Sequence, residues 1–237
     1  MQKVFGLIPV VFLIGLFALV GCSGGDRGAG AQGLPIIDAV QHQGGRLIGR
    51  VASLGRGMSR PRGEGKLCGV NGLEGERIPP ITSEVEGCGV PDPVQVTHVD
   101  GVRLSQPAIM DCETAAALHT WVRKGVRPAV GRTGGGVTGL RVAAHYVCRT
   151  RNHRPGARIS EHGRGRAIDI SAIELADGET MTVLNDWHNS PHSRALRQMH
   201  GAACGTFGTT LGPGSDGMHE DHFHYDTARH RGGPYCR

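Results

Sequence analysis

The stretch HEDHFHYD, residues 219 to 226, predicts a strand that carries metal ligands, because it packs three histidines and three acids into eight positions. Side chains of an extended strand alternate between two faces, so His222 and His224 point one way and Phe223 the other. Two imidazoles on one strand face favour zinc, since neutral ring nitrogens are common zinc ligands. The pair alone is weak support, because such a spacing arises readily by chance among 13 histidines.

Candidates for further ligands lie upstream in ISEHGRGRAIDI, residues 159 to 170. The spacing of His162 and Asp169 does not fit one helix face, whereas a strand, a glycine-containing turn and a second strand would bring both side chains together. Asp169 lies between two isoleucines, and a carboxylate buried there must be paired, hydrogen-bonded or metal-bound. The alternative is an ion pair with Arg164 or Arg166, which would leave the histidines unexplained.

The surrounding sequence predicts an α+β domain. Asp100-Gly101 within VQVTHVDGVRL, residues 94 to 104, indicates a hairpin, and Asp111 is a suitable N-cap for a helix that ends at Gly125, with Pro128 preventing its continuation. We expect a small central, mostly antiparallel sheet flanked by helices, with the zinc site on the sheet. The remaining expected elements are strands at 137–148, 167–173 and 222–227 and a helix at 191–203.

The N-terminus has the features of an export signal, with Lys3 followed by an apolar run to Val20. Residues 1–21 resemble a lipoprotein signal peptide, and Cys22 would then be the lipidated residue; the alternative is an uncleaved membrane anchor. We expect residues 22–66 to form a flexible tether and residues 67–237 to form the folded domain. This predicts a periplasmic, lipid-anchored protein, in the outer membrane rather than the inner one because Ser23 follows the cysteine.

Apart from Cys22 the chain has an even set of six cysteines, which in an exported protein predicts three disulfides. The pairing is open, and we favour neighbours in sequence: Cys68 with Cys88, Cys112 with Cys148, and Cys204 with Cys236. The formal net charge of +5 comes without basic runs or interleaved aromatics, which argues against nucleic acid as a partner. Mild basicity suits an anionic polymer such as the cell wall.

Two motifs in this order resemble those of a group of zinc peptidases that includes D-Ala-D-Ala metallopeptidases, murein endopeptidases and lysostaphin-type enzymes. They are Ser160-x-His162-x-x-Gly165-x-Ala167-x-Asp169 and the distal His222-x-His224, and with His219 the second motif is similar to that of the penicillin-insensitive murein endopeptidases. Over about residues 67 to 236 the chain resembles more closely still the bacterial extensin-like C-terminal domain family. The segments that carry this resemblance are CGV, MDCETAAAL, CRTRN, SEHGRGRAIDI and LGPGSDGMHEDHFHYD.

The resemblance implies that His162, Asp169 and His224 are the ligands of one zinc ion. Three protein ligands would leave a position for water, whose pKa zinc can lower to about 7. His222 would be the acid/base or transition-state residue, with His219 as the second candidate.

The resemblance also aligns Arg149 with an arginine that would bind a peptide carboxylate or the oxyanion; the alternative is a surface arginine. Ser160 would support the turn by hydrogen bonding. Asp221 or Asp226 would hold the second nitrogen of a histidine, as carboxylates around metal sites often do.

These expectations combine into a zinc-dependent peptidoglycan peptidase that hydrolyses amide bonds in murein stem peptides or cross-links. Its partners would be peptidoglycan and, through Cys22, the membrane, and we expect a monomer. The alternative is a catalytically inactive peptidoglycan-binding lipoprotein that retains the metal site. A cupin-like site would need a glutamate a few residues after H-x-H, and a carbonic-anhydrase-like site would make Asp169 redundant.

Overall fold

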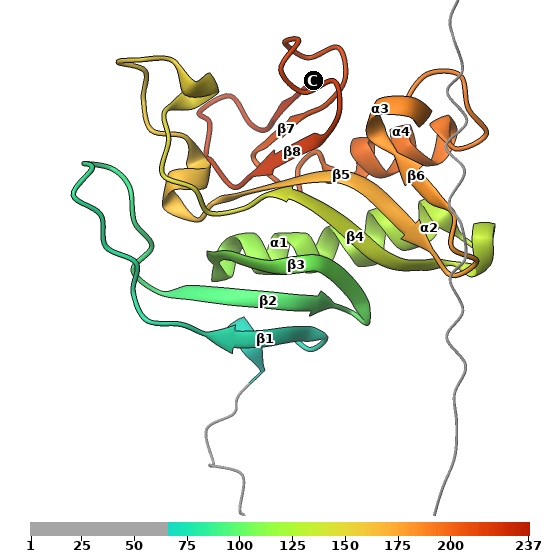
Figure 1. Ribbon diagram of the computed structural model, residues 1–237, viewed down its shortest axis with the longest axis horizontal. Coiled ribbons are helices and arrows are strands. Elements are labelled where there is room, and N and C mark those ends of the chain that lie inside the picture. Colours follow the sequence, from blue (N-terminus) through green and yellow to red (C-terminus); the bar gives the residue numbers. More distant parts are fainter. Residues whose placement is uncertain (1–65) are drawn as a thin grey trace, which may run out of the picture. The chain divides into compact units, whose positions relative to one another are not determined.

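A computed structural model describes residues 66–237, which form a mixed sheet with helices packed against it (Figure 1). The sheet has nine strands in these residues, in the order β1-β2-β3-β4-β5-β8-β7-β9, with β6 paired to β5. The pairs β3–β4 and β7–β9 are parallel and the others antiparallel. The α+β class and the mostly antiparallel sheet are therefore confirmed.

The strands are short, apart from the long central ones. Their bounds are β1 Leu73–Arg77, β2 Pro93–Val99, β3 Val102–Asp111, β4 Val137–Ala144, β5 Ala167–Leu175, β6 Thr180–Thr182, β7 Thr209–Leu211, β8 Phe223–Asp226 and β9 Tyr235–Cys236. The α-helices are α1 Cys112–Trp121, α2 Arg127–Val130, α3 Val183–Asp186 and α4 Ser193–Ala203. A π-helical turn, η2, covers Val122–Val126, and short 3-10 turns include η1 Leu67–Gly69, η3 Thr133–Gly135, η4 Arg151–His153 and η5 Glu161–Arg164.

The predicted hairpin and the start of the first helix are confirmed. Asp100 and Gly101 join β2 to β3 with positive φ angles of 52° and 77°, the backbone that an Asp-Gly hairpin turn requires. Asp111 caps α1, because its carboxylate accepts a hydrogen bond of 2.8 Å from the backbone N–H of Thr114. The sequence signals at this end of the sheet are local, and the local structure follows them.

The predicted end of this helix is wrong. The chain passes through η2 into α2, where Pro128 occupies the first turn, a position at which its missing N–H costs little. Gly125 lies within η2 and leaves room for its neighbours: a Cβ atom there would come within 2.9 Å of Trp121 and within 3.1 Å of Ala202 on α4. Helix packing therefore explains a glycine that the sequence suggested as a stop.

The hydrophobic core lies between the sheet and α1, η2 and α4 (Figure 1). Trp121 is fully buried and donates a hydrogen bond of 2.7 Å from Nε1 to the backbone carbonyl of Met199, which ties α1 to α4. Its ring meets Tyr225 of β8 edge to face, with 5.0 Å between centroids. The core thus supports β8 from behind and fixes the strand that carries the histidines.

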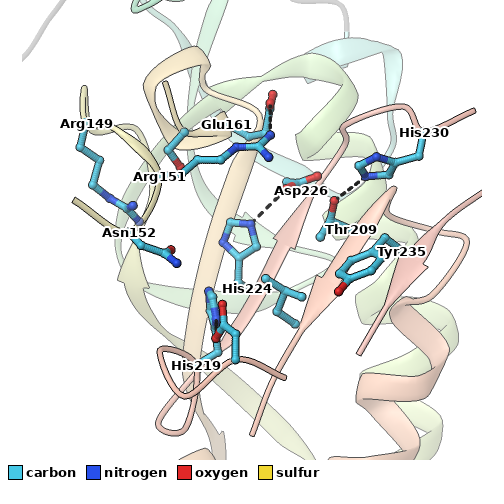
Figure 2. Close-up of a pocket in the computed structure, with 13 residues that line it drawn as sticks. Arg149, Arg151, Asn152, Glu161, Thr209, His219, His224, Asp226, His230 and Tyr235 are labelled. Atoms are coloured by element: carbon cyan, nitrogen blue, oxygen red, sulfur yellow. Dashed lines mark hydrogen bonds and ion pairs between the residues drawn. The ribbon is translucent and has the colours of Figure 1, made fainter. Parts of the chain in front are cut away.

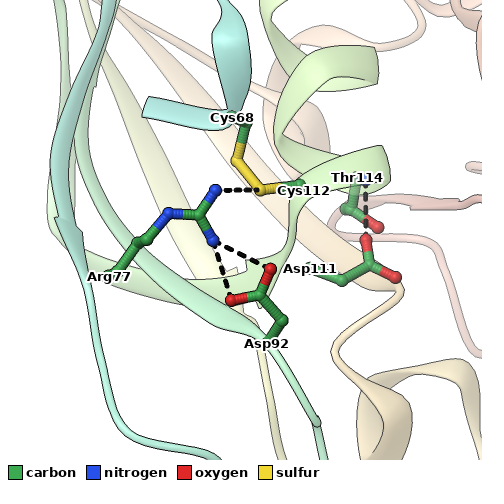
Figure 3. Close-up of a disulfide and its surroundings, with 6 residues drawn as sticks. All are labelled: Cys68, Arg77, Asp92, Asp111, Cys112 and Thr114. Atoms are coloured by element: carbon green, nitrogen blue, oxygen red, sulfur yellow. Dashed lines mark hydrogen bonds and ion pairs between the residues drawn. A yellow bond between two sulfur atoms is a disulfide. The ribbon is translucent and has the colours of Figure 1, made fainter. Parts of the chain in front are cut away.

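The structure forms three disulfides, as predicted, but two of the favoured pairings are wrong. The observed pairs are Cys68–Cys112, Cys88–Cys148 and Cys204–Cys236. Residues that are neighbours in sequence are separated because η1 lies against the start of α1, which brings Cys68 to Cys112 beside the Arg77–Asp92 ion pair (Figure 3). The loop that carries Cys88 instead packs on residues 147–163.

The predicted signal peptide, residues 1–21, the lipidation site Cys22 and nearly all of the tether, residues 22–66, lie outside the described residues. Among the residues that are described, no helix has the length and apolar character needed to cross a membrane.

Candidate metal centre

Two of the three candidate ligands are brought together by strand pairing. In the antiparallel pair β5–β8, Asp169 lies directly opposite His224, and side chains of opposed residues share one face of a sheet. Oδ1 of Asp169 lies 2.8 Å from Nδ1 of His224. The register of two central strands therefore fixes two of the three candidate ligands.

The third candidate, His162, comes from irregular backbone that precedes β5. It lies on η5 and not on the strand that the sequence suggested. Ser160 caps this turn, its Oγ accepting a hydrogen bond of 3.4 Å from the N–H of His162, so it supports the turn as predicted. Gly165 ends the turn with a φ of +67°, and a Cβ there would lie 2.7 Å from Val90. This tight turn takes the chain from His162 into β5.

His162, Asp169 and His224 form a buried group that could hold a metal ion, with one ligand atom of each within 4.8 Å of the others. Nε2 of His162 lies 3.1 Å from Oδ2 of Asp169 and 3.2 Å from Nδ1 of His224. The alternative partners of Asp169 are excluded: Arg166 lies 3.7 Å from Asp111, and Arg164 reaches the carbonyl of Gly87.

The outward nitrogens of both histidines are held by fixed acceptors. Nδ1 of His162 donates to the backbone carbonyl of His145 at 2.8 Å, and Nε2 of His224 donates to the carboxylate of Asp226 at 3.1 Å. In a neutral imidazole only one nitrogen carries hydrogen. When both rings are neutral, two nitrogen lone pairs and a carboxylate oxygen therefore converge on one buried point, which calls for a cation.

Without a metal ion, a proton takes that role. Burial lowers the pKa of His224, but hydrogen bonds and charges from Asp169 and Asp226 outweigh burial and raise this pKa to about 9. Burial raises the pKa of Asp169, but hydrogen bonds and positive charge from His162 and His224 outweigh it and hold this pKa well below its usual range. The donor set fits a divalent cation such as zinc, because two imidazoles and a carboxylate are ligands that zinc accepts.

Two further histidines lie beside this group, each oriented by an aspartate. Nδ1 of His222 contacts Asp221 at 2.7 Å, and Nε2 of His222 lies 3.7 Å from Oδ2 of Asp169. Nδ1 of His219 contacts Asp216 at 2.6 Å, and the His219 ring lies 5.1 Å from the His222 ring between centroids. In both histidine–aspartate pairs, which we call dyads, the carboxylate contacts Nδ1, so Nε2 of the ring can interact with another group.

Burial lowers the pKa of His219, and the hydrogen bond that Asp216 accepts from its ring opposes this shift. Burial raises the pKa of Asp216, but its hydrogen bond with His219 and the backbone N–H of Met218 outweigh burial and lower that pKa. Asp216 is not among the site residues predicted from the sequence, although its position three residues before His219 on a glycine-rich loop could have indicated it. The carbonyl of His145 had no signal in the sequence.

An open pocket of about 260 Å³, which we call the metal pocket, lies over His224 (Figure 2). Arg149 lines it and is half-buried, and residues 66–237 offer its guanidinium no ion pair. Arg151 and the buried Glu161, neither of them singled out by the sequence, form an ion pair of 3.4 Å in its wall. His224 is the ligand that reaches this pocket, whereas His162 and Asp169 lie deeper.

Comparison with known proteins agrees with the resemblance to the extensin-like C-terminal domain family. Neither the curated proteins nor the solved structures include a significant match. The family described as "Extensin-like protein C-terminus" matches residues 68–237, which cover the folded domain and every residue of the candidate metal centre. The chain therefore belongs to the extensin-like C-terminal family.

Proposed function

We propose that this chain is a zinc-dependent peptidoglycan peptidase that acts in the periplasm, tethered by lipid at Cys22. The observation that carries the proposal is the convergence of His162, Asp169 and His224 on one buried point at the edge of a pocket. A structural zinc site would close around four protein ligands, whereas a catalytic one leaves a position open. Three ligands, one of which reaches a pocket, support the catalytic type.

His162, Asp169 and His224 would hold the zinc ion, with His145 and Asp226 orienting the two imidazoles. When bound, zinc supplies a Lewis acid and a source of nucleophilic water near neutral pH. The protein must then move protons and orient the peptide, and the residues around the pocket carry groups suited to both tasks.

Proton transfer falls to the two histidine–aspartate dyads. His222 can accept and return a proton at Nε2, because Asp221 holds Nδ1 and the ring edge faces Asp169. His219 is placed to help at its own Nε2, since its ring lies 5.4 Å from that of His224 between centroids. An amide needs a donor for its leaving amine, which gives His222 and His219 complementary roles.

Substrate orientation falls to Arg149, whose guanidinium lines the pocket and matches a carboxylate in a two-pronged contact. Its backbone carbonyl accepts a hydrogen bond of 2.9 Å from the N–H of Ser160, which couples its position to the turn that carries His162. Arg149 is therefore suited to bind a terminal carboxylate or to stabilise the oxyanion.

The test is incubation of the full chain with purified cross-linked muropeptides, followed by mass spectrometry of the products. Chelation should abolish cleavage, and added zinc should restore it in the wild type but not in His162→Ala. His98→Ala, a histidine of β2 outside the site, is the matched control and should cleave normally. Retention of muropeptides without released fragments, even with zinc present, would favour the inactive binding protein instead.

A further inference from the structure

A second groove, rich in arginine, adjoins the metal pocket. It has a volume of about 590 Å³ and shares Arg151, Glu161 and His230 with the metal pocket as common lining. We call it the arginine groove, after the five arginines that line it: Arg151, Arg158, Arg164, Arg166 and Arg229. A ligand that extends from the metal pocket past Glu161 would enter this groove.

The groove has more positive charge than its own acids neutralise. Three of its arginines face carboxylates: Arg151 pairs with Glu161 at 3.4 Å, Arg166 with Asp111 at 3.7 Å and Arg229 with Glu113 at 3.0 Å.

Arg158 and Arg164 have no carboxylate partner within residues 66–237, and Arg164 makes only a long contact of 3.4 Å to the carbonyl of Gly87. Two guanidinium groups are therefore left for an external anion.

The backbone holds these arginines in a fixed relation to the metal ligands. Residues 148–166, which we call the ligand arm, fold back on themselves, with the N–H of Arg151 donating to the carbonyl of Arg158 at 2.9 Å and Thr150 bridged to Ile159. The arm also contains η5 and His162. The groove and the metal centre are therefore both built on the ligand arm, so groove arginines and the ligand His162 keep a fixed relation.

We propose, building on the proposed function, that the arginine groove binds side-chain or α-carboxylates of an acidic peptide whose scissile amide lies over His224. A guanidinium presents two parallel donors that match a carboxylate. Two free guanidinium groups between glutamate-bearing walls suit one or two carboxylates better than a run of phosphates. The groove also has no Phe, Tyr or Trp in its lining among the described residues, and these large rings are the usual stacking surfaces for nucleobases.

The experiment measures binding separately from turnover. The probes are two synthetic stem peptides of identical sequence, one with a free α-carboxylate on its D-glutamate and one with that group amidated. Binding to the chelated full chain is measured by calorimetry for the wild type and for the double variant Arg158→Gln/Arg164→Gln. The control, Arg123→Gln/Arg194→Gln, removes the same charge from exposed arginines that do not line the groove.

We expect the double variant to lose about tenfold or more in affinity for the acidic peptide, the scale of one lost charge-assisted contact. The control should bind like the wild type, and the amidated peptide should bind weakly and equally to all three proteins. Equal losses for both peptides would overturn the inference, as would single-stranded DNA that binds in the same arginine-dependent way more tightly than the peptide.

The two proposals fail differently. If the acidic peptide binds in an arginine-dependent manner but zinc-loaded protein cleaves nothing, the groove stands and the peptidase falls. If zinc-loaded wild type cleaves both peptides and binds them with equal affinity, and the double variant binds both like the wild type, the peptidase stands and the groove falls.

Discussion

Asp169 and His224 reach the candidate metal centre from paired strands, whereas His162 reaches it from the irregular ligand arm. The strand pair is buried and its register is set by the core behind it. The arm is held by a few backbone hydrogen bonds and by Cys88–Cys148. The same site therefore depends on two kinds of support, one built on long-range packing and one on local restraints that can be removed singly.

The largest effect should come from the strand half. Asp169→Asn removes the only carboxylate of the ligand group, so we expect loss of stoichiometric zinc from the purified protein and loss of muropeptide cleavage. Metal content by mass spectrometry is the measurement. Asp177→Asn, in the exposed turn after β5, is the matched control and should retain zinc; equal metal content in both variants would contradict the ligand assignment.

The arm half should respond next, through its disulfide. Cys88–Cys148 packs against Gly163, where a Cβ would come within 3.1 Å of the Cys88 sulfur, so Cys88→Ser/Cys148→Ser should weaken zinc binding and lower the free energy of unfolding by about 2–5 kcal/mol. Cys68→Ser/Cys112→Ser should destabilise the protein similarly while zinc affinity holds. Calorimetry measures the stability and zinc titration the affinity. A matching loss of zinc affinity in both variants would contradict a specific role of Cys88–Cys148 in holding the arm.

A smaller effect should follow from changing how a ligand is held. Asp226→Asn keeps an acceptor for Nε2 of His224 but removes the charge, so zinc affinity should fall about 10- to 100-fold. Asp221→Asn perturbs His222, which is not among the ligands, and should lower turnover while zinc affinity stays unchanged. Competition with a chelating dye measures both, and a loss of zinc affinity in Asp221→Asn would place His222 among the ligands.

The smallest effect concerns His200, which stacks on Phe223 of the same strand as His224 with 4.9 Å between centroids. Burial lowers the pKa of His200 below 6.5, and its hydrogen bond to the carbonyl of Arg237 opposes that shift. The unfolded chain therefore binds more protons, so stability should fall as pH drops below 6.5. His200→Gln should flatten this acid-side decline in melting temperature by a few degrees, and an unchanged pH profile would contradict it.

The same division explains what could be predicted from the sequence. The alternation in β8, the Asp-Gly hairpin and the Asp111 cap are local signals, and they placed His224, β2–β3 and α1 correctly. The ligand arm has no such periodicity. The sequence predicts a strand where the 3-10 turn η5 forms, and it wrongly favours Cys68 as the disulfide partner of Cys88.

Disulfide partners and the continuation past Gly125 depend on which distant elements pack together, which a local pattern does not contain. Asp169 was a good candidate because a carboxylate between two isoleucines needs a partner. No local pattern predicts Glu161 or the carbonyl of His145 at the site. Like Asp216, they lie on loops whose path depends on tertiary contacts.

The covalent link between Cys88 and Cys148 has a consequence for timing. A newly made copy in a reducing compartment would hold its ligand arm without this covalent restraint, because thiols stay unjoined there. Zinc would then bind more weakly until the two cysteines are joined, so full metal loading would follow oxidation.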